Sequence, residues 1–143
     1  HVPPSHFENA EVAAAEYEAR IREAGGIDWQ LLGIGRDGHV GFNEPGSDSE
    51  TRTRRVDLAD ETREDAAPTF GGLEYVPTHA MTMGVGTILE AKRIVLIARG
   101  AGKKEIVAEA LTGDVGPHVP ASYLRDHQNV EWFLDHAAAG IGA

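Results

Sequence analysis

The chain has 143 residues, which is enough for one domain with a hydrophobic core but not for two. Its net charge of −10 argues against binding nucleic acid, which would require clustered basic residues. The absence of cysteine excludes disulfides and thiolate metal sites and suits a cytoplasmic location. No apolar run approaches the ~18 residues of a membrane span and no signal peptide is recognisable, so no membrane partner is expected.

The first half of the chain is predicted to alternate between helices, strands and glycine-rich loops. Apolar residues on a single narrow face predict a helix over residues 9–24, with Asn9 as its N-cap and Gly25 and Gly26 at its end. The following segments are predicted, in order, as a strand (27–34), a short strand (54–58), one or two helical turns (59–65) and a loop broken by Pro68, Gly71 and Gly72.

The second half continues the alternation. It is predicted to contain a strand turning into a helix (80–91), a strand (93–98), a glycine turn and helix (100–113), a short helix (120–128) and a last strand (130–135). This order predicts an α/β fold with a mainly parallel sheet flanked by helices, Rossmann-like and three-layered. We expect residues 1–143 to form a single α/β domain, with ligands at the carboxyl ends of the strands.

The clearest candidate site is the string GIGRDGHVGFNEP, which directly follows the first predicted strand. Gly33 and Gly41 allow the backbone to approach a ligand closely. His39 is suited to proton transfer near neutral pH, and Asp37 and Glu44 can each hydrogen-bond one imidazole nitrogen. We therefore predict a carboxylate–His–carboxylate relay that moves protons on a small polar substrate.

Less specific interpretations of this string remain open. Glycines after a strand often form only a tight turn, and a single histidine in a loop is often simply exposed. The spacing Asp-x-His-x4-Glu could also bind a metal through nitrogen and oxygen ligands. No second histidine stands at helical ligand spacing, so we favour proton transfer and expect no metal.

A second glycine turn, in the string ARGAGKKE, opens a predicted helix. Such a helix start attracts phosphate, and Lys103 adds a positive charge. The spacing does not match a nucleotide P-loop. The alternative is a turn with solvated lysines. The basic string TRTRR could also bind an anion, or could be a charged strand edge.

At LLGIGRDGHVGFNEPGS the sequence resembles the glucosamine-6-phosphate deaminases. The likeness continues in TRTRRVDL, in VPTHAMTMGVGTILEAKRIVLIARGAGKKEIV and in VPASYLRDH, and covers nearly the whole chain from about Ala13 to His136. The related 6-phosphogluconolactonases share the fold and a DGH-like turn but diverge after the histidine.

The resemblance implies conversion of D-glucosamine 6-phosphate to D-fructose 6-phosphate and ammonia, without a metal or redox cofactor. It implies that His39 opens the sugar ring, with Asp37 and Glu44 as its relay. Gly33 and Gly41 would lie against the sugar, and Lys103 would hold the phosphate. The family is often trimeric or hexameric, so a homo-oligomer is an expected partner besides the sugar phosphate.

The chain also departs from the family pattern. Family members are much longer, and their N-terminal half carries a phosphate loop and the aspartate that removes the C2 proton. We therefore expect this chain to be the C-terminal portion of a deaminase and inactive alone. Pro68 stands where the family usually places a phosphate-binding arginine, for which Arg63 and Arg99 are candidate replacements. Val56 stands where regulated members carry a lysine, so we do not expect allosteric activation.

Two other functions are compatible with the sequence. One is a non-catalytic sugar-phosphate-binding protein that keeps the fold. The other is a hydrolase of the 6-phosphogluconolactonase type.

Overall fold

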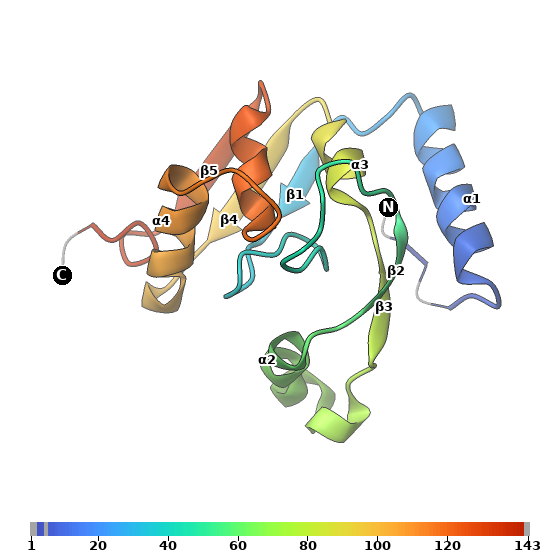
Figure 1. Ribbon diagram of the computed structural model, residues 1–143, viewed down its shortest axis with the longest axis horizontal. Coiled ribbons are helices and arrows are strands. Elements are labelled where there is room, and N and C mark those ends of the chain that lie inside the picture. The colour runs from blue at the N-terminus through green and yellow to red at the C-terminus, as the bar shows by residue number, and fades with distance from the viewer. Residues whose placement is uncertain (1–2, 5, 142–143) are drawn as a thin grey trace.

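The structure is a computed structural model that describes residues 3–4 and 6–141 (Figure 1). In chain order its elements are α1 (Ala10–Glu23), β1 (Gln30–Leu32), β2 (Arg54–Asp57), α2 (Asp60–Phe70), the 3₁₀ turn η1 (Leu73–Tyr75), β3 (His79–Thr82), α3 (Val85–Leu89), β4 (Ile94–Ala98), η2 (Ala101–Lys103), α4 (Lys104–Thr112), η3 (Pro120–Asp126) and β5 (Val130–Leu134). None of the described helices is both long and apolar enough to cross a membrane.

The centre of the fold is a three-stranded parallel sheet in the order β1-β4-β5. Leu31 of β1 is in register with Val95 of β4, and Val95 is in register with Glu131 of β5. The α/β class and the parallel sheet are confirmed. The predicted strand over 27–34 is shorter than expected, since only residues 30–32 pair.

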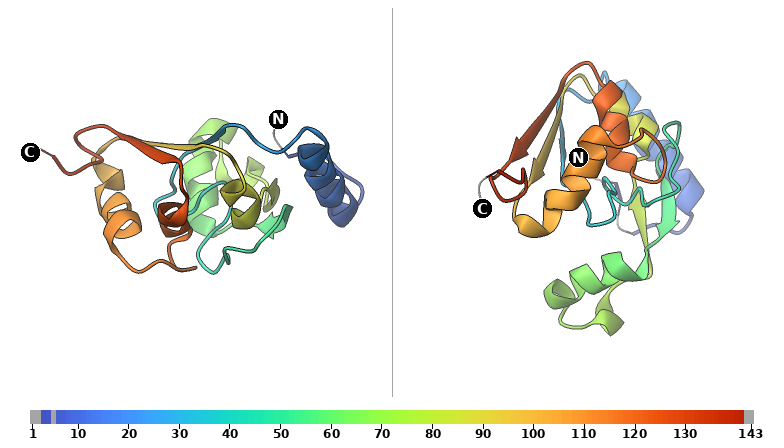
Figure 2. Two further views of the ribbon diagram at one scale, coloured as in Figure 1. Left: turned by 90° about the horizontal axis from the view of Figure 1, so that it is seen from above. Right: turned by 60° about the vertical axis from the view of Figure 1, so that its left-hand side comes forward.

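One face of this sheet forms the core, and helices α3, α4 and η3 cover it (Figure 2). Successive side chains of a strand point to opposite faces, so Leu32 and Leu96 face these helices while their neighbours face away. Leu96 is fully buried, and Val107 of α4 and Leu124 of η3 belong to the same apolar cluster.

The opposite face of the sheet is apolar but exposed. Leu31 is 58% exposed, Ile97 48% and Phe133 53%, and Trp29 beside them is 58% exposed. The helices within the described part of the chain therefore cover one face, and the third layer of the expected three-layer arrangement is not packed here. We call this surface the outer face.

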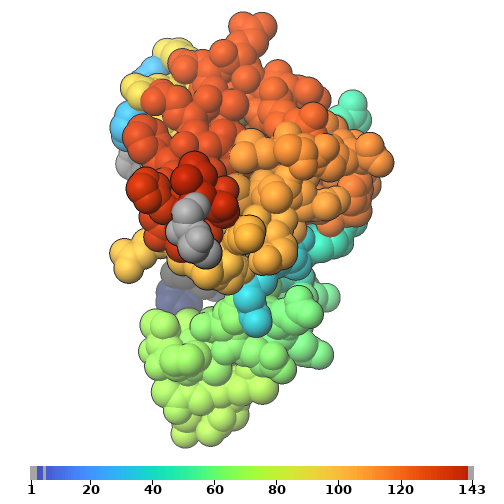
Figure 3. All heavy atoms as spheres, turned by 90° about the vertical axis from the view of Figure 1, so that its left-hand side faces the viewer, coloured from blue at the N-terminus to red at the C-terminus, as the bar shows by residue number. Residues whose placement is uncertain are grey.

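An arm extends from the body of the molecule (Figures 1 and 3). It is an antiparallel pair of β2 and β3, in which Arg54 is in register with Thr82 and Asp57 with His79. Between these strands the chain forms α2 and η1, which hang below the sheet. The arm, residues 54–82, forms one side of the cleft described below.

Helix α2 corrects the prediction that Pro68 breaks the chain into a loop. The helix continues through Pro68 to Phe70 and ends at Gly71, which has a φ of 83°. Pro68 has no N–H to donate to the carbonyl of Glu64 four residues earlier, and the helix ends two residues later at Phe70. Gly71 and Gly72 both donate to the carbonyl of Ala67 and close the helix.

Helix α1 confirms the predicted cap, since the Asn9 side chain accepts a 3.0 Å hydrogen bond from Val12 N. The helix lies beside β2 at the far end of the molecule from α4 (Figure 1). Glu18 fixes it there, because its Oε1 accepts from the amide and the hydroxyl of Thr53 and from the hydroxyl of Thr87 in α3.

Candidate active site

The loop after β1 is a tight turn built on glycines. Gly35 N donates to the carbonyl of His39 at 2.9 Å, and Gly38 adopts a φ of 87° that most side chains would disfavour. The Gly38 carbonyl accepts from Ala121 N of η3 at 2.9 Å. These contacts hold the turn at the carboxyl end of β1, the place where parallel sheets bind ligands.

The turn brings Asp37 and His39 together. Asp37 Oδ1 lies 2.7 Å from His39 Nδ1 and accepts a 3.1 Å hydrogen bond from the amide of His39. This side-chain contact does not meet the geometry of a hydrogen bond, so it is an electrostatic contact. His39 Nε2 has no partner among the described residues, which leaves it for a ligand.

Gly35 belongs to the site through its contact with the His39 ring, a role that the sequence interpretation did not assign to it. A Cβ at this position would lie 2.2 Å from His39 Cε1 and 2.3 Å from Nδ1. The imidazole therefore packs on the Gly35 backbone, and any side chain there would push it away from Asp37. The GxGxDGH pattern was the available signal, but it did not reveal which glycine faces the ring.

An open cleft of about 910 Å³ extends between the sheet and the arm. It is lined by four of the six residues expected to form the site, which are Gly33, His39, Gly41 and Lys103. Gly33 has open space beside it, whereas a Cβ at Gly41 would meet Thr82 Oγ1 at 2.9 Å. Lys103, which follows the second glycine turn, thus lies in the same cleft as His39 of the first.

Lys103 reaches this cleft because β1 and β4 are neighbours in the sheet. It ends the 3₁₀ turn η2 and stands at the N-cap of α4, where helix amides attract anions. One amide of the turn is already occupied, since Gly100 N donates to both carboxylate oxygens of Asp135 at 3.1 and 3.0 Å. Hydrogen bonds from Ala138 N and Gly100 N lower the pKa of Asp135.

Glu44 is not brought to His39, and no hydrogen bond or ion pair joins them within the described chain. Its two carboxylate oxygens accept from Ala59 N at 3.1 and 3.0 Å, and Oε1 also accepts from Thr62 Oγ1 at 2.7 Å. Glu44 therefore caps the N-terminus of α2, where a negative charge is favourable. The structure thus brings Asp37, but not Glu44, to the His39 side chain that lines the cleft, and Glu44 joins the loop to the arm.

A second set of residues forms a hydrogen-bonded network behind the loop. Asn43 is fully buried and donates to the carbonyls of Val40 and Met83, both at 2.8 Å. Arg54 donates to Asn43 Oδ1 and to Ser47 Oγ, and burial lowers the pKa of its guanidinium. This network supports the segment that carries Glu44, and it engages both Ser47 and Arg54 within the chain.

Arg63, a candidate replacement for the phosphate-binding arginine, is engaged elsewhere. Its Nη2 donates to the carbonyls of Leu73 and Val76 and so packs η1 against α2.

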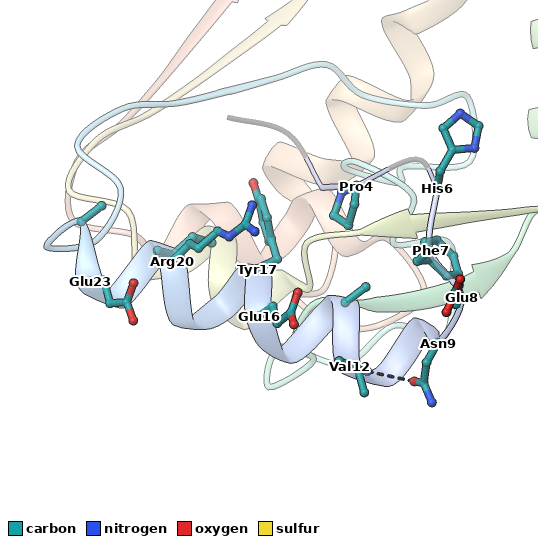
Figure 4. A pocket seen from close by; sticks show the side chains of 13 residues that line it. Pro4, His6, Phe7, Glu8, Asn9, Val12, Glu16, Tyr17, Arg20 and Glu23 are labelled. Atoms are coloured by element: carbon teal, nitrogen blue, oxygen red, sulfur yellow. Dashed lines mark hydrogen bonds between the residues drawn. The ribbon is translucent and has the colours of Figure 1, made fainter.

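Another hollow lies along α1, beside Pro4 and residues 6–8 (Figure 4). Tyr17 and Arg20 project into it from the helix, and Asn9 is occupied as the N-cap. Burial and the neighbouring Glu18 raise the pKa of Tyr17. No ion pair joins the described residues that line this hollow, in contrast to the Asp37–His39 pair at the cleft.

These features define an α/β protein with an Asp–His pair and a lysine at the carboxyl ends of parallel strands. The profile of the family described as glucosamine-6-phosphate isomerases/6-phosphogluconolactonase matches residues 1–132. The chain belongs to this family.

Two curated relatives are similar to this chain over nearly its whole length. A glucosamine-6-phosphate deaminase of Rhodopirellula baltica is 50% identical over 99% of the chain, and one of Mycolicibacterium smegmatis is 49% identical over 96%. The chain covers 56% and 53% of these two proteins. It thus spans about half the length of the curated relatives it matches.

A solved monomeric glucosamine-6-phosphate deaminase superposes on 99% of this chain with a TM-score of 0.95 and 40% identity, and the chain covers 59% of it. A 6-phosphogluconolactonase from Trypanosoma cruzi superposes less closely, with a TM-score of 0.68 and 22% identity, and shows the fold alone. The deaminases are therefore the nearer of the two branches.

Proposed function

We propose that this chain carries part of the active site of an amino-sugar-phosphate isomerase and deaminase, which converts D-glucosamine 6-phosphate to D-fructose 6-phosphate and ammonia. The observation that carries the proposal is the 2.7 Å Asp37–His39 contact in a cleft that also holds Lys103. The high identity to proteins named glucosamine-6-phosphate deaminase supports the choice of substrate.

In the proposed reaction His39 opens the sugar ring. Opening a cyclic hemiacetal removes the proton of the O1 hydroxyl, breaks the C1–O5 bond and adds a proton to O5. The free Nε2 of His39 can accept the first proton and return one, while the Asp37 carboxylate holds the ring and stabilises its charged form. Lys103 holds the phosphate as a point charge.

The later isomerisation step needs a base that takes the C2 proton, and Asp37 is already committed to His39. We infer that this base comes from polypeptide that packs on the outer face, and that the chain is the C-terminal portion of a longer deaminase domain. Leu31 supports this inference, because it is exposed on the outer face and also lines the cleft. Polypeptide covering Leu31 would form a further wall of the cleft.

The test joins this chain to the segment of the Rhodopirellula baltica deaminase that it does not match. We expect ammonia release from glucosamine 6-phosphate by the joined protein and none by the 143-residue chain alone. His39→Asn in the joined protein is the matched control and should abolish release.

Three results would change the proposal. Ammonia release by the chain alone would require a base within it. No release by a folded joined protein would reject the deaminase, and binding of the sugar phosphate without release would favour the non-catalytic alternative.

Two further expectations belong to the proposal. A cytoplasmic location accords with a cysteine-free chain, and fractionation of the native protein tests it. Homo-oligomer formation is the second expectation, and sedimentation of the joined protein tests it against the monomeric state described for a solved relative.

A further inference from the structure

Arg36 stands in the turn between Gly35 and Asp37, and its side chain reaches from this turn to the arm. Its Nε lies 2.9 Å from Asp65 Oδ2 and its Nη2 lies 2.6 Å from Asp65 Oδ1. The two groups thus form a bidentate pair that bridges the His39 turn and α2. Both side chains are about half exposed, at 54% and 51%, so solvent and small ligands can reach the pair.

The charges around this pair matter for an anionic ligand. Helix α2 begins with four carboxylates, Asp60, Glu61, Glu64 and Asp65. Asp65 lines the cleft together with Lys103. A carboxylate in the wall of a cleft repels a phosphate dianion, and that repulsion is cancelled only while a cation is held beside it.

Arg36 also has unused hydrogen-bonding capacity. A guanidinium carries five N–H donors, and the contacts with Asp65 use Nε and Nη2. Nη1 has no protein partner within the described residues. The planar fork that grips two carboxylate oxygens fits two phosphate oxygens equally well.

We propose that Arg36 is a phosphate-binding residue of the cleft, for which the carboxylate of Asp65 and the phosphate of the incoming sugar compete. Asp65 holds the guanidinium at the mouth of the cleft in the absence of substrate. The phosphate then replaces Asp65 at Nε and Nη2 of Arg36, and Lys103 is the second cation that contacts it. This inference rests on the proposed function for the identity of the ligand.

The test is a titration of the 143-residue chain and its variants with glucosamine 6-phosphate, inorganic phosphate and glucosamine, followed by NMR at fixed ionic strength. Arg36→Ala should weaken binding of both phosphate ligands about tenfold and leave glucosamine unaffected. Arg36→Lys should give a smaller loss, because it keeps the charge but not the fork. Asp65→Asn should tighten phosphate binding about threefold, because it removes the competitor.

The matched control is Glu90→Gln. It frees Arg52 from a similarly exposed ion pair outside the cleft and should leave phosphate affinity unchanged. Three results would overturn the inference: equal phosphate affinities of Arg36→Ala and the parent chain, weaker binding by Asp65→Asn, or no measurable phosphate binding by the parent chain.

The two experiments distinguish failure of the proposed function from failure of this inference. If only the proposed function fails, the joined protein releases no ammonia while phosphate binding still depends on Arg36, which rejects the deaminase and keeps the phosphate site. Ammonia release together with affinities that do not depend on Arg36 rejects only the present inference.

Discussion

The body and the arm of this molecule are built by different forces. The body, made of β1, β4 and β5 with α3, α4 and η3, encloses an apolar cluster in which Ile94, Leu96 and Leu124 are fully buried. Helix α2 in the arm has no buried residue. It is held by polar contacts instead, which are the Glu44 cap, the Arg36–Asp65 pair and the Arg63 contacts with carbonyls.

This difference bears on function because the cleft uses both regions. His39 and Lys103 belong to the rigid body, whereas Asp65 and Thr62 belong to the arm. Polar surface contacts are individually weak, so α2 can change position at little cost while the Asp37–His39 pair keeps its geometry. The predictions below test this contrast.

The largest expected effect is in the core of the body. Leu96→Ala should lower the free energy of unfolding by about 3 kcal/mol, because it leaves a cavity in the middle strand. The control is Ile97→Ala, which removes a side chain that is 48% exposed on the outer face and should cost less than about 1 kcal/mol. Urea titrations measure both, and equal losses would contradict the assignment of the two faces.

The next largest effect concerns the geometry of the Asp37–His39 pair. Gly35→Ala places a Cβ where the His39 ring lies, so ammonia release by the joined protein should fall about a hundredfold. Gly33→Ala has space for its Cβ and should leave the imidazole NMR signals of His39 unchanged, whereas Gly35→Ala should shift them. Unshifted signals in Gly35→Ala would show that the ring does not depend on this glycine.

A smaller effect is expected at the base of the arm. Glu44→Gln should destabilise α2 locally by about 1 kcal/mol, because it removes the charge that caps the helix. Hydrogen exchange of the α2 amides measures this loss, while amides of β4 should keep their protection. Glu64→Gln, in the middle of the same helix, is the control. Equal acceleration in β4 would mean that the arm and the body unfold together.

The smallest effect is a pH dependence of stability where Glu18 of α1 contacts Thr53, which precedes β2, and Thr87 of α3. Burial raises the pKa of Glu18, but the hydrogen bonds from Thr53 and Thr87 and the charge of Arg52 outweigh it and leave the pKa below its ordinary 4.5. A depressed folded-state pKa stabilises the protein above the unfolded value, and this stability is lost as the pH falls through the folded value.

Glu18→Gln should therefore flatten the acid loss of stability below pH 4.5. The change should be at most about 1 kcal/mol, because solvent screens a half-exposed carboxylate. Thermal unfolding between pH 3 and 7 tests it. Glu16→Gln, an exposed position of the same helix, should show no such flattening, and identical profiles for the two variants would contradict the role of Glu18.

Local features of the fold and site could be predicted from the sequence. Asp37 and His39 are two residues apart in a glycine turn, so their contact needs no distant part of the chain. The cap at Asn9 is local for the same reason. Lys103 is distant in sequence but follows a predicted parallel strand, and the carboxyl ends of such strands meet at one edge.

Other features could not be predicted because their partners are distant and not periodic. Glu44 lies close to His39 in sequence, yet its carboxylate is used by Ala59 and Thr62 in the arm. Asp65 could be predicted only as a charged residue of a short helix, because its partner Arg36 is 29 residues away in the sequence. The helix through Pro68 was not predicted either, because proline removes a backbone donor and usually ends a helix, whereas α2 continues to Phe70.

The sequence by itself determined the order of strands and helices, the glycine turn and the local Asp37–His39 pair, since these depend on periodicity and on neighbouring residues. Only the tertiary structure decided that Glu44 caps α2 and does not contact His39, and that Asp65 pairs with Arg36. The reason is that hydrogen bonds and ion pairs act over a few ångströms, and the packing of the arm against the body sets those separations.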